Sequence, residues 1–588
     1  MCGVLMAFAK NNQLNENYCK KASEKIFSRG PDFNFSRFKL DNRLFLSQTV
    51  LSITGSPELN LDYTTSKNKR YEILFNGEIY NFKELQSKYL DKKGLINLSN
   101  SDTETLINLH QILTPQNVIN IIEGMYAYVI YDSLNKKLFI SRDIIGEKVL
   151  YKYEDDNLFV ISSQLGPILE IAKNIKINKK VLKNYFFTRH LLTETETVFE
   201  KISVFQPGQT IEINLENFDK KILHNKDIQH LFNEESLKET MKKSNEDILF
   251  EADKIMKENA DFIYPDSDFF SVVSGGIDST LVSKYLNDNS EKKPNFICLQ
   301  FPGKDKVASE VKIFEKYLKN KIYEINVDTN LFQNYIEECY KSICMPLPTH
   351  SFISQAILAR VVFKKGGKIL FTGDGGDELF GGYEFYKNIK FSNKKFDYNP
   401  SIYSGVVDLN VKFKNFEKDE ILFKSEKQWK DTIINYEKFD PMEATIQSIL
   451  LLDTKIQLES VGIRASDTMS MMSSVESRGF FLTKKILNFA INLPANMKIK
   501  VDENFTETRP LMKKLFSKNF DKSLIKPKQG FSGYPNESMK RLISNFDITR
   551  EYLQVENFKK LDIENNLALE WKFLNAEYFL KTFQENAK

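Results

Sequence analysis

The first residues that could carry chemistry form a glycine-rich stretch, SGGIDS at 274–279, which follows an apolar run predicted to be a strand. Glycines in such a strand-to-helix turn let backbone N–H groups point at an anion, and the next helix adds a positive dipole. No lysine follows the glycines, as it would in a Walker A loop, but Asp278 offers a carboxylate of the kind that Mg²⁺ prefers. The alternative interpretation is a tight turn in which a serine only caps the helix. The predicted phosphate-binding residues are Ser274, Gly275, Gly276, Asp278 and Ser279.

A second glycine-rich stretch, TGDGGDELFGGY at 372–383, follows another predicted strand about 95 residues later. Ligands of open parallel sheets bind beyond the carboxyl ends of the strands. Two such loops at two such ends therefore converge on one crevice. We expect Asp278 and Asp377 to share a Mg²⁺ ion there. A solvated acidic loop would account for the acids but not for so many glycines between them.

The start of the chain offers a third candidate, Cys2, between Met1 and a glycine. Removal of Met1 would leave Cys2 with a free α-amino group, whose unperturbed pKa near 7.7–8.0 suits a base that activates the thiol. Alone, a cysteine at this position is more easily explained as accidental. Asn76 and Gly77 end a predicted strand, where a side-chain amide and a backbone N–H can face an oxyanion. Asp102 could hold a substrate ammonium group, or could instead cap a helix.

Two kinds of domain must position these residues. The first ~200 residues read as short alternating strands with intervening helices, which predicts a layered αββα sandwich. A polar helical stretch over about 233–259 then forms a bridge. From Asp268 strands and helices alternate, the signature of a parallel α/β sheet, and after Tyr383 the chain reads as mainly helical. We expect domains over residues 2–215 and 235–588.

Composition narrows the functional classes. The 588 residues carry a net charge of only +3, which gives no support for nucleic-acid binding. No run of about 18 apolar residues exists, so we expect no membrane span. The N-terminus lacks the features of a signal peptide, and the five cysteines show no paired zinc spacing. We therefore expect a cytoplasmic protein.

Several of these motifs, in order, resemble known families. SGGIDS resembles the pyrophosphate loop of N-type ATP pyrophosphatases. Cys2, RGPD at 29–32, NGEIYN at 76–81, Asp102 and RDIIG at 142–146 resemble class II glutamine amidotransferases. The later loops, with DTMSM at 467–471 and KPKQGF at 526–531, resemble the synthetase half of glutamine-hydrolysing asparagine synthetases. The matches run from residue 2 to about 533, and several motifs in order are far more specific than one.

The resemblance implies a fold, substrates and residue roles. It implies an N-terminal nucleophile hydrolase-like αββα sandwich followed by a parallel-sheet adenine nucleotide hydrolase-like domain with a helical C-terminal part. Glutamine would supply ammonia through a tunnel to an acyl adenylate made from ATP and aspartate, with Mg²⁺ as cofactor; a homodimer is an open alternative to a monomer. The implied catalytic residues are Cys2, Asn76, Gly77, Asp374 and Lys528. The implied glutamine-binding residues are Val50, Leu51, Ser52, Ile53, Glu78 and Asp102, and the residues implied to line the ATP site besides the SGGIDS loop are Val272, Leu299, Thr372 and Gly373.

The sequence departs from the family pattern at three places. Val50 stands where the family usually has the arginine that binds the glutamine α-carboxylate; Arg43, Arg29 or Arg70 could replace it only if the fold brings one of them there. Met345 replaces a usual glutamate, and GFFLT at 479–483 replaces the usual VPFLD. The last two put aspartate in doubt as acceptor, so a sugar acid or a secondary-metabolite acid is the alternative. Two other functions are alternatives to an amidotransferase. A non-catalytic scaffold that retains the fold would need none of the candidate residues, and a lactam-forming cyclase would not need Cys2.

Overall fold

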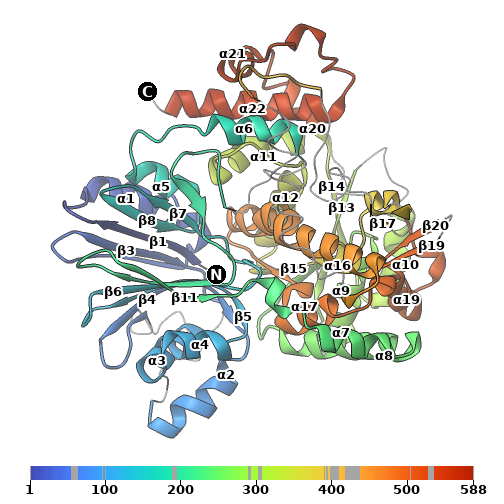
Figure 1. The fold of residues 1–588 in the computed structure, drawn as a ribbon, viewed down its shortest axis with the longest axis horizontal. Helices are drawn as coiled ribbons and strands as arrows, with labels where there is room; N and C mark the ends of the chain where they lie inside the picture. Colours follow the sequence, from blue (N-terminus) through green and yellow to red (C-terminus); the bar gives the residue numbers. More distant parts are fainter. Residues whose placement is uncertain are drawn as a thin grey trace.

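The computed structural model describes residues 2–586 except 54–63, 96, 98, 100, 189–194, 289–292, 302–306, 390, 393–394, 397–409, 417–437, 503–504 and 528–534. Figure 1 shows two units side by side: a pair of stacked sheets formed by the first part of the chain, and a helix-rich unit formed by the rest. Lys528, predicted to be catalytic, lies outside the described residues.

The first unit contains two antiparallel sheets. One has the order β2 (Phe33–Lys39), β3 (Leu44–Val50), β1 (Cys2–Ala9), β8 (Leu158–Ser162), β7 (Tyr151–Glu154), β9 (Ile202–Val204). The other has the order β11 (Lys220–Asn225), β10 (Gln209–Asn214), β6 (Lys137–Arg142), β5 (Gly124–Asp132), β4 (Tyr71–Ile79). The predicted pattern of short strands in the first ~200 residues is present, and β3 ends at Val50.

Alternation along β1 shows how the layers form. Val4 and Met6 pack between the two sheets, whereas Leu5 points to the outer face, where it joins the core beneath α1 (Glu16–Glu24) and α5 (Leu165–Ile171). On the other sheet, Ile73 of β4 points outward, into the cluster formed with α3 (Asp102–Ile112) and α4 (Pro115–Ile121). The order helix, sheet, sheet, helix confirms the predicted αββα sandwich.

The bridge to the second unit is two helices rather than one. α7 (Glu234–Met241) ends before Ser244, whose side chain accepts from the Asp247 N–H and starts α8 (Asn245–Phe262). A serine N-cap of this kind breaks a continuous polar pattern that sequence periodicity alone reads as one helix.

The second unit is built on a fully parallel sheet of order β14 (Ile322–Asn326), β13 (Asn295–Gln300), β12 (Phe270–Val272), β15 (Ile369–Thr372), β18 (Glu476–Gly479). The strand order reverses between β12 and β15, and such a switch point is where parallel sheets bind ligands. The two glycine-rich loops follow these two strands. The sheet therefore brings both loops to one crevice, as predicted.

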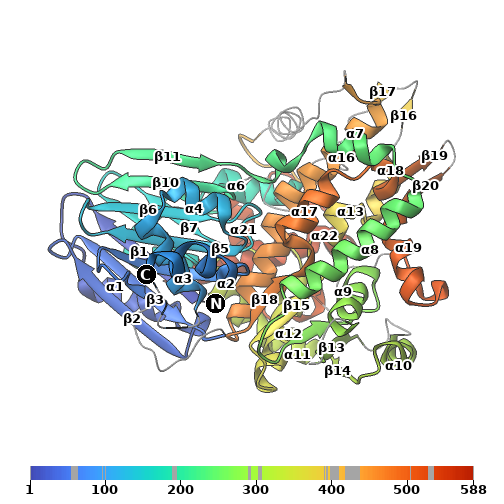
Figure 2. The ribbon, with the colours of Figure 1, turned by 90° about the horizontal axis from the view of Figure 1, so that it is seen from below.

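β18 was not predicted, because its sequence ESRG has no apolar pattern. It is nevertheless buried and pairs with β15 in parallel register, with Thr372 beside Gly479. Figure 2 shows β18 and β15 on the side of this unit that faces the stacked sheets. An edge strand of the parallel sheet thus lies at the boundary between the two units.

Helices surround this sheet and extend to the end of the chain. The main ones are α9 (Ile277–Asp288), α10 (Val307–Leu318), α11 (Thr329–Ile343), α12 (Ser351–Lys364), α16 (Pro441–Asp453), α17 (Lys484–Ile491), α19 (Pro510–Asn519), α21 (Asp547–Leu553) and α22 (Leu567–Asn586). α16 continues in wider turns through residues 454–469, a form often found at functional sites. Within the described part of the chain, no helix combines the length and apolarity needed to cross a bilayer.

Candidate active sites

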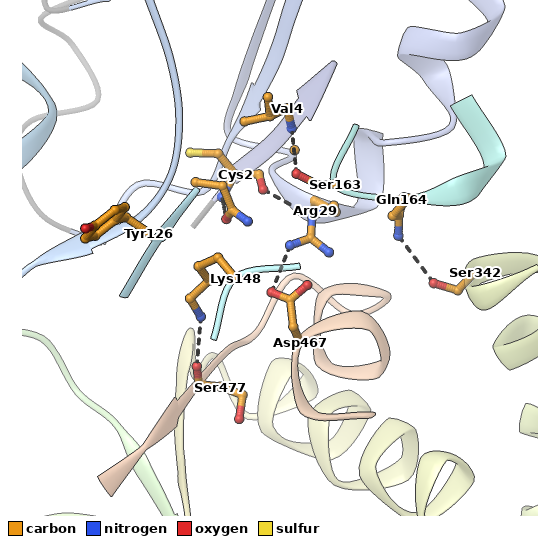
Figure 3. Close-up of polar contacts among 12 residues, drawn as sticks. Cys2, Val4, Arg29, Tyr126, Lys148, Ser163, Gln164, Ser342, Asp467 and Ser477 are labelled. Atoms are coloured by element: carbon orange, nitrogen blue, oxygen red, sulfur yellow. Dashed lines mark hydrogen bonds and ion pairs between the residues drawn. The ribbon is translucent and has the colours of Figure 1, made fainter. Parts of the chain in front are cut away.

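Cys2 is the first residue of β1 (Figure 3). Its backbone N–H donates to Asn76 Oδ1 over 3.0 Å. In the antiparallel register Cys2 lies opposite Val50, and its side chain belongs to the series, with Val4, that points between the sheets. Burial raises the pKa of the thiol. A thiol in this setting needs an adjacent base before it can attack.

Asn76 and Gly77 lie side by side on β4 next to β5. The φ of Gly77 is +152°, and a Cβ there would come within 2.0 Å of the Met125 carbonyl oxygen, so only glycine fits. Asn76 Nδ2 is buried and donates to no partner among the described residues. Because buried donors are nearly always paired in folded proteins, this amide group is suited to an oxygen atom of a ligand.

Glu78 and Asp102 bring two buried carboxylates to the same end of β4. Asp102 Oδ2 accepts from the Ile79 N–H over 2.9 Å, and Ser101 rather than Asp102 is the N-cap of α3. Burial raises the pKa of Glu78 to about 8, against the lowering effect of Arg478, whose Nη2 lies 3.3 Å from Glu78 Oε2. Burial also raises the pKa of Asp102 to about 6. Two buried acids beside Cys2 can hold an ammonium group.

The segment 50–53 begins at Val50, the last residue of β3, which lies opposite Cys2. Val50 and Leu51 are buried, and the Ser52 N–H donates to Asp32 Oδ2 over 2.9 Å. Lys368, just before β15 in the second unit, places its ammonium group 2.7 Å from Asp32 Oδ2 and 3.1 Å from the Ser52 carbonyl oxygen. The predicted glutamine-binding segment is thus in contact with the second unit.

The structure decides between the arginines that could replace the one missing at Val50. Arg43 donates to the Ala9 carbonyl at the far end of β1, and Arg70 pairs with Asp132 over 2.6 Å. Arg29 alone lies beside Cys2. Arg43 and Arg70 therefore do not take the place of the missing arginine.

Arg29 links Cys2 to the second unit. Its Nε donates to the Cys2 carbonyl oxygen over 3.1 Å, and its Nη2 lies 2.9 Å from Asp467 Oδ1 (Figure 3). Both side chains are almost fully buried. Lys148 crosses the same boundary, donating to the Ser477 carbonyl of β18 over 3.2 Å. Because buried charged groups are costly to leave without partners, these contacts favour the observed arrangement of the two units.

The second site is a cavity of about 310 Å³ at the switch point of the parallel sheet. All the residues predicted to bind ATP line it: Val272, Ser274, Gly275, Gly276, Asp278, Ser279, Leu299, Thr372 and Gly373. Asp374 and Asp377 line it as well. The two glycine-rich loops are in close contact, since a Cβ on Gly376 would come within 2.8 Å of Asp278 Cγ.

Arg509 joins the two acids that were predicted to bind metal. Its Nη1 lies 2.8 Å from Asp278 Oδ2 and 3.4 Å from Asp377 Oδ1. Arg509 has a φ of +45°, an uncommon conformation for a non-glycine residue, directly before α19. Sequence reasoning missed Arg509, because it lies about 130 residues beyond the second loop and no local pattern marks it.

Asp374 follows β15 and accepts hydrogen bonds from two hydroxyl groups of the second unit. Its Oδ2 accepts from Thr372 Oγ1 over 2.8 Å and from Ser466 Oγ. Nearby, the Tyr383 hydroxyl donates to Glu378 Oε1 over 2.5 Å, and burial raises the pKa of Glu378 to about 8. Among the cavity residues, Glu378 is thus a carboxyl group whose protonated form is favoured by burial.

The oxygen ligands at this cavity fit a Mg²⁺ ion that is also bound by phosphate groups. Among the described residues no group of three or more acidic, histidine or cysteine side chains could enclose a metal. Mg²⁺ commonly takes one or two carboxylates and completes its shell with phosphate oxygens and water. Asp278 and Asp377, which both lie beside the guanidinium group of Arg509, match that pattern.

The residues that depart from the family pattern have structural roles. Met345 is fully buried in the core. Thr483 accepts from the Ile486 N–H as the N-cap of α17, and its hydroxyl contacts Asn259. The Gly479 N–H donates to Glu147 Oε1 of the first unit over 2.9 Å.

Two family models match the chain. The glutamine amidotransferase domain model matches residues 1–224, and the asparagine synthase model matches residues 266–588. Asparagine synthetase (glutamine-hydrolyzing) 1 of Bacillus subtilis is 24% identical over 551 residues, covering 85% of this chain and 82% of that protein. Amidase chry2 of Gibberella zeae is 23% identical over 385 residues, covering 62% and 54%. A solved structure, that of the allosteric regulatory enzyme of purine biosynthesis, matches at 12% identity over 55% of this chain and 80% of its own with a TM-score of 0.29, which is too low to support any argument.

The asparagine synthase model spans more than half of the chain, and the amidotransferase model covers the unit that holds Cys2. The chain therefore belongs to the asparagine synthase family and is a ligase that carries a glutamine amidotransferase domain ahead of its synthase domain.

Proposed function

We propose that this ligase transfers ammonia from glutamine to a carboxylate that it has activated as an acyl adenylate, with aspartate as the leading acceptor and asparagine, AMP and pyrophosphate as products. The observation that carries the proposal is the presence of two candidate sites in one chain. One site centres on Cys2, and the other is the cavity between the two glycine-rich loops.

At the first site Cys2 attacks the side-chain amide of glutamine. Its own α-nitrogen, held by Asn76 Oδ1, takes the thiol proton and passes it to the departing nitrogen. Asn76 Nδ2 and the Gly77 N–H stabilise the oxyanion. Glu78 and Asp102 hold the glutamine α-ammonium group. Water then hydrolyses the thioester and releases glutamate.

At the second site the loop backbone after β12 holds the triphosphate at the start of α9, where the helix dipole favours negative charge. The acceptor carboxylate attacks the α-phosphorus, and pyrophosphate leaves. Arg509 and the proposed Lys528 neutralise the phosphate charge, and Asp374 assists the attack of ammonia on the adenylate. Mg²⁺, held by Asp278 and Asp377, would supply further neutralisation of the pyrophosphate when bound.

The identity of the acceptor carboxylate is a separate part of the proposal. Thr483 caps a helix and Met345 is core, so neither provides a charged contact for an amino acid. Support for aspartate comes from the relative of Bacillus subtilis, whose name states asparagine synthesis with glutamine hydrolysis. A different carboxylate is the second candidate, because among the described residues the cations that line the cavity, Arg509 and Lys526, are both paired with acids.

An acceptor panel tests the proposal. The full-length chain is incubated with ATP, Mg²⁺ and glutamine, and with aspartate, sugar acids or other carboxylic acids in turn, while AMP and pyrophosphate are measured. We expect acceptor-dependent release of both. No acceptor-dependent AMP with any carboxylate would contradict an adenylating ligase, and AMP release with every acid except aspartate would assign a different acceptor.

A further inference from the structure

β18 brings an arginine of the second unit to the glutamine end of the first unit. Arg478 is 2% exposed, and its Nη2 lies 3.3 Å from Oε2 of Glu78, which is also buried. Its Cζ lies 5.7 Å from the centroid of the Tyr80 ring, two residues after Glu78. Among the described residues, Arg478 is the cation that forms an ion pair with Glu78. A residue of the synthase domain therefore contacts a carboxylate that is proposed to bind glutamine.

Contacts with both units hold Arg478 in this position. Its Nε lies 2.5 Å from Glu476 Oε1, and its Nη1 donates to the Ile263 carbonyl oxygen over 3.4 Å. The backbone groups of the residues before and after it in β18 make hydrogen bonds with the side chains of Lys148 and Glu147 of the first unit. The guanidinium group is therefore fixed beside Glu78 by the fold of the second unit and by the boundary.

The other side chains that act on the charge of Glu78 are acids. Burial raises the pKa of Glu78 to about 8, and Arg478 is the strongest opposing influence. Asp102 of α3 and Glu476 of β18 raise that pKa further, whereas the N-terminus of the chain lowers it. Tyr80 faces the same cluster and stays neutral, because burial raises its pKa. Without Arg478, the charged form of Glu78 would be surrounded by like charges in a buried place and would be costly to form.

We propose that Arg478 is a positioning residue of the glutamine site, which holds the carboxylate of Glu78 in its charged form for the α-ammonium group of glutamine. The inference rests on the proposed function, in which Glu78 and Asp102 bind that group. An amide without an α-ammonium group gains nothing from this charge. Arg478 therefore makes the first unit select glutamine over simpler amides, and recognition of the amide donor depends on a residue of the synthase domain.

The test compares two ligands that differ only in the α-amino group, glutamine and glutaric acid monoamide. Both are titrated into the full-length protein with Cys2→Ala, which removes the nucleophile, and into the same protein with Arg478→Gln added. We expect Arg478→Gln to weaken glutamine binding roughly 10- to 150-fold, as for the loss of a charged hydrogen-bonding partner. Binding of the monoamide should hardly change.

The pH dependence separates a charge effect from a packing effect. The ratio of the two affinities is used, because it cancels the titration of groups that do not contact the α-amino group. With Arg478 present, this ratio should rise with pH as Glu78 ionises and should level off above about pH 8. With Arg478→Gln the pKa of Glu78 is higher, so the ratio should level off only at a higher pH. Arg478→Lys, which keeps the positive charge, should restore part of the difference.

Two further variants serve as controls. Glu476→Gln combined with Arg478→Gln avoids leaving Glu476 buried without its partner. It should still weaken glutamine binding, because Arg478 acts more strongly on Glu78 than Glu476 does. Arg550→Gln, at an exposed arginine of the second unit, should match the parent.

The outcomes distinguish the inference from the proposed function. Equal losses for both ligands, or an unchanged glutamine affinity in the folded variants, would show that Arg478 only packs the boundary, and the inference would be wrong. If the parent protein does not hydrolyse glutamine, the proposed function fails and the inference fails with it.

Discussion

Replacing Val50 by arginine tests how the first unit binds the α-carboxylate of glutamine. Val50 is buried opposite Cys2 and belongs to the face of β3 that points between the sheets. The neighbouring cations already have partners: Arg29 pairs with Asp467, and Lys368 pairs with Asp32. The parent protein should therefore bind glutamine weakly and use added ammonium comparatively well.

The expected gain in affinity for glutamine comes from a single charge-assisted contact between the new arginine and the α-carboxylate. Hydrogen bonds to charged groups contribute about 1.5–3 kcal/mol, which corresponds to a roughly 10- to 150-fold lower KM for glutamine. Without glutamine the new guanidinium would be buried and unpaired, so Val50→Arg should lower the Tm. A glutamine analogue should recover part of that loss.

The assay compares glutamine KM for the parent, Val50→Arg and Val50→Met, the last being a control for size without charge. Ammonium-dependent synthesis serves as the control for an intact second site. A parent KM already in the micromolar range, or an equal change in both variants, would refute the reasoning and assign the carboxylate to another group.

Further predictions concern the two sites separately. Cys2→Ala should abolish glutamine hydrolysis and keep ammonium-dependent synthesis, and mass analysis should show Met1 absent; hydrolysis at the parent rate would exclude Cys2 as nucleophile. Asp278→Asn should remove Mg²⁺-dependent AMP and pyrophosphate formation while leaving glutaminase activity, and formation of ADP by the parent would refute adenylation. Lys528→Ala should slow synthesis by ~10²–10³ with little change in ATP affinity, and a loss confined to ATP affinity would make it a binding residue only.

Local patterns were enough to predict the layers of the first unit and the two loops of the second. Glycine-rich turns that follow apolar strands predict loops whose backbone N–H groups can bind an anion. In the structure, Asp278 and Asp377 of these loops both contact one cation, Arg509. Alternation of apolar residues likewise predicted β1 and its neighbours. These features are encoded by residues close together in the sequence.

Contacts between residues far apart in the sequence could not be predicted in this way. Arg478 lies 400 residues from Glu78, yet the two side chains pair. β18 lacks the alternation of apolar residues that is typical of a strand, and it becomes part of the sheet through its pairing with β15. Arg509 reaches Asp278 only because α19 packs near α9. These three contacts depend on burial and pairing between residues that are far apart in the sequence. A single sequence does not show which distant residues meet in the fold.

The position of β18 late in the chain has a consequence for the order of events on the ribosome. The first unit ends near residue 225, but Asp467 and Arg478 emerge roughly 250 residues later, a delay of about 10–50 s at typical rates of synthesis. Throughout that interval Arg29 and Glu78 lack the partners that hold them in the finished protein. The nascent first unit therefore lacks the contacts of Arg29 and Glu78 with the second unit until the synthase domain has been synthesised.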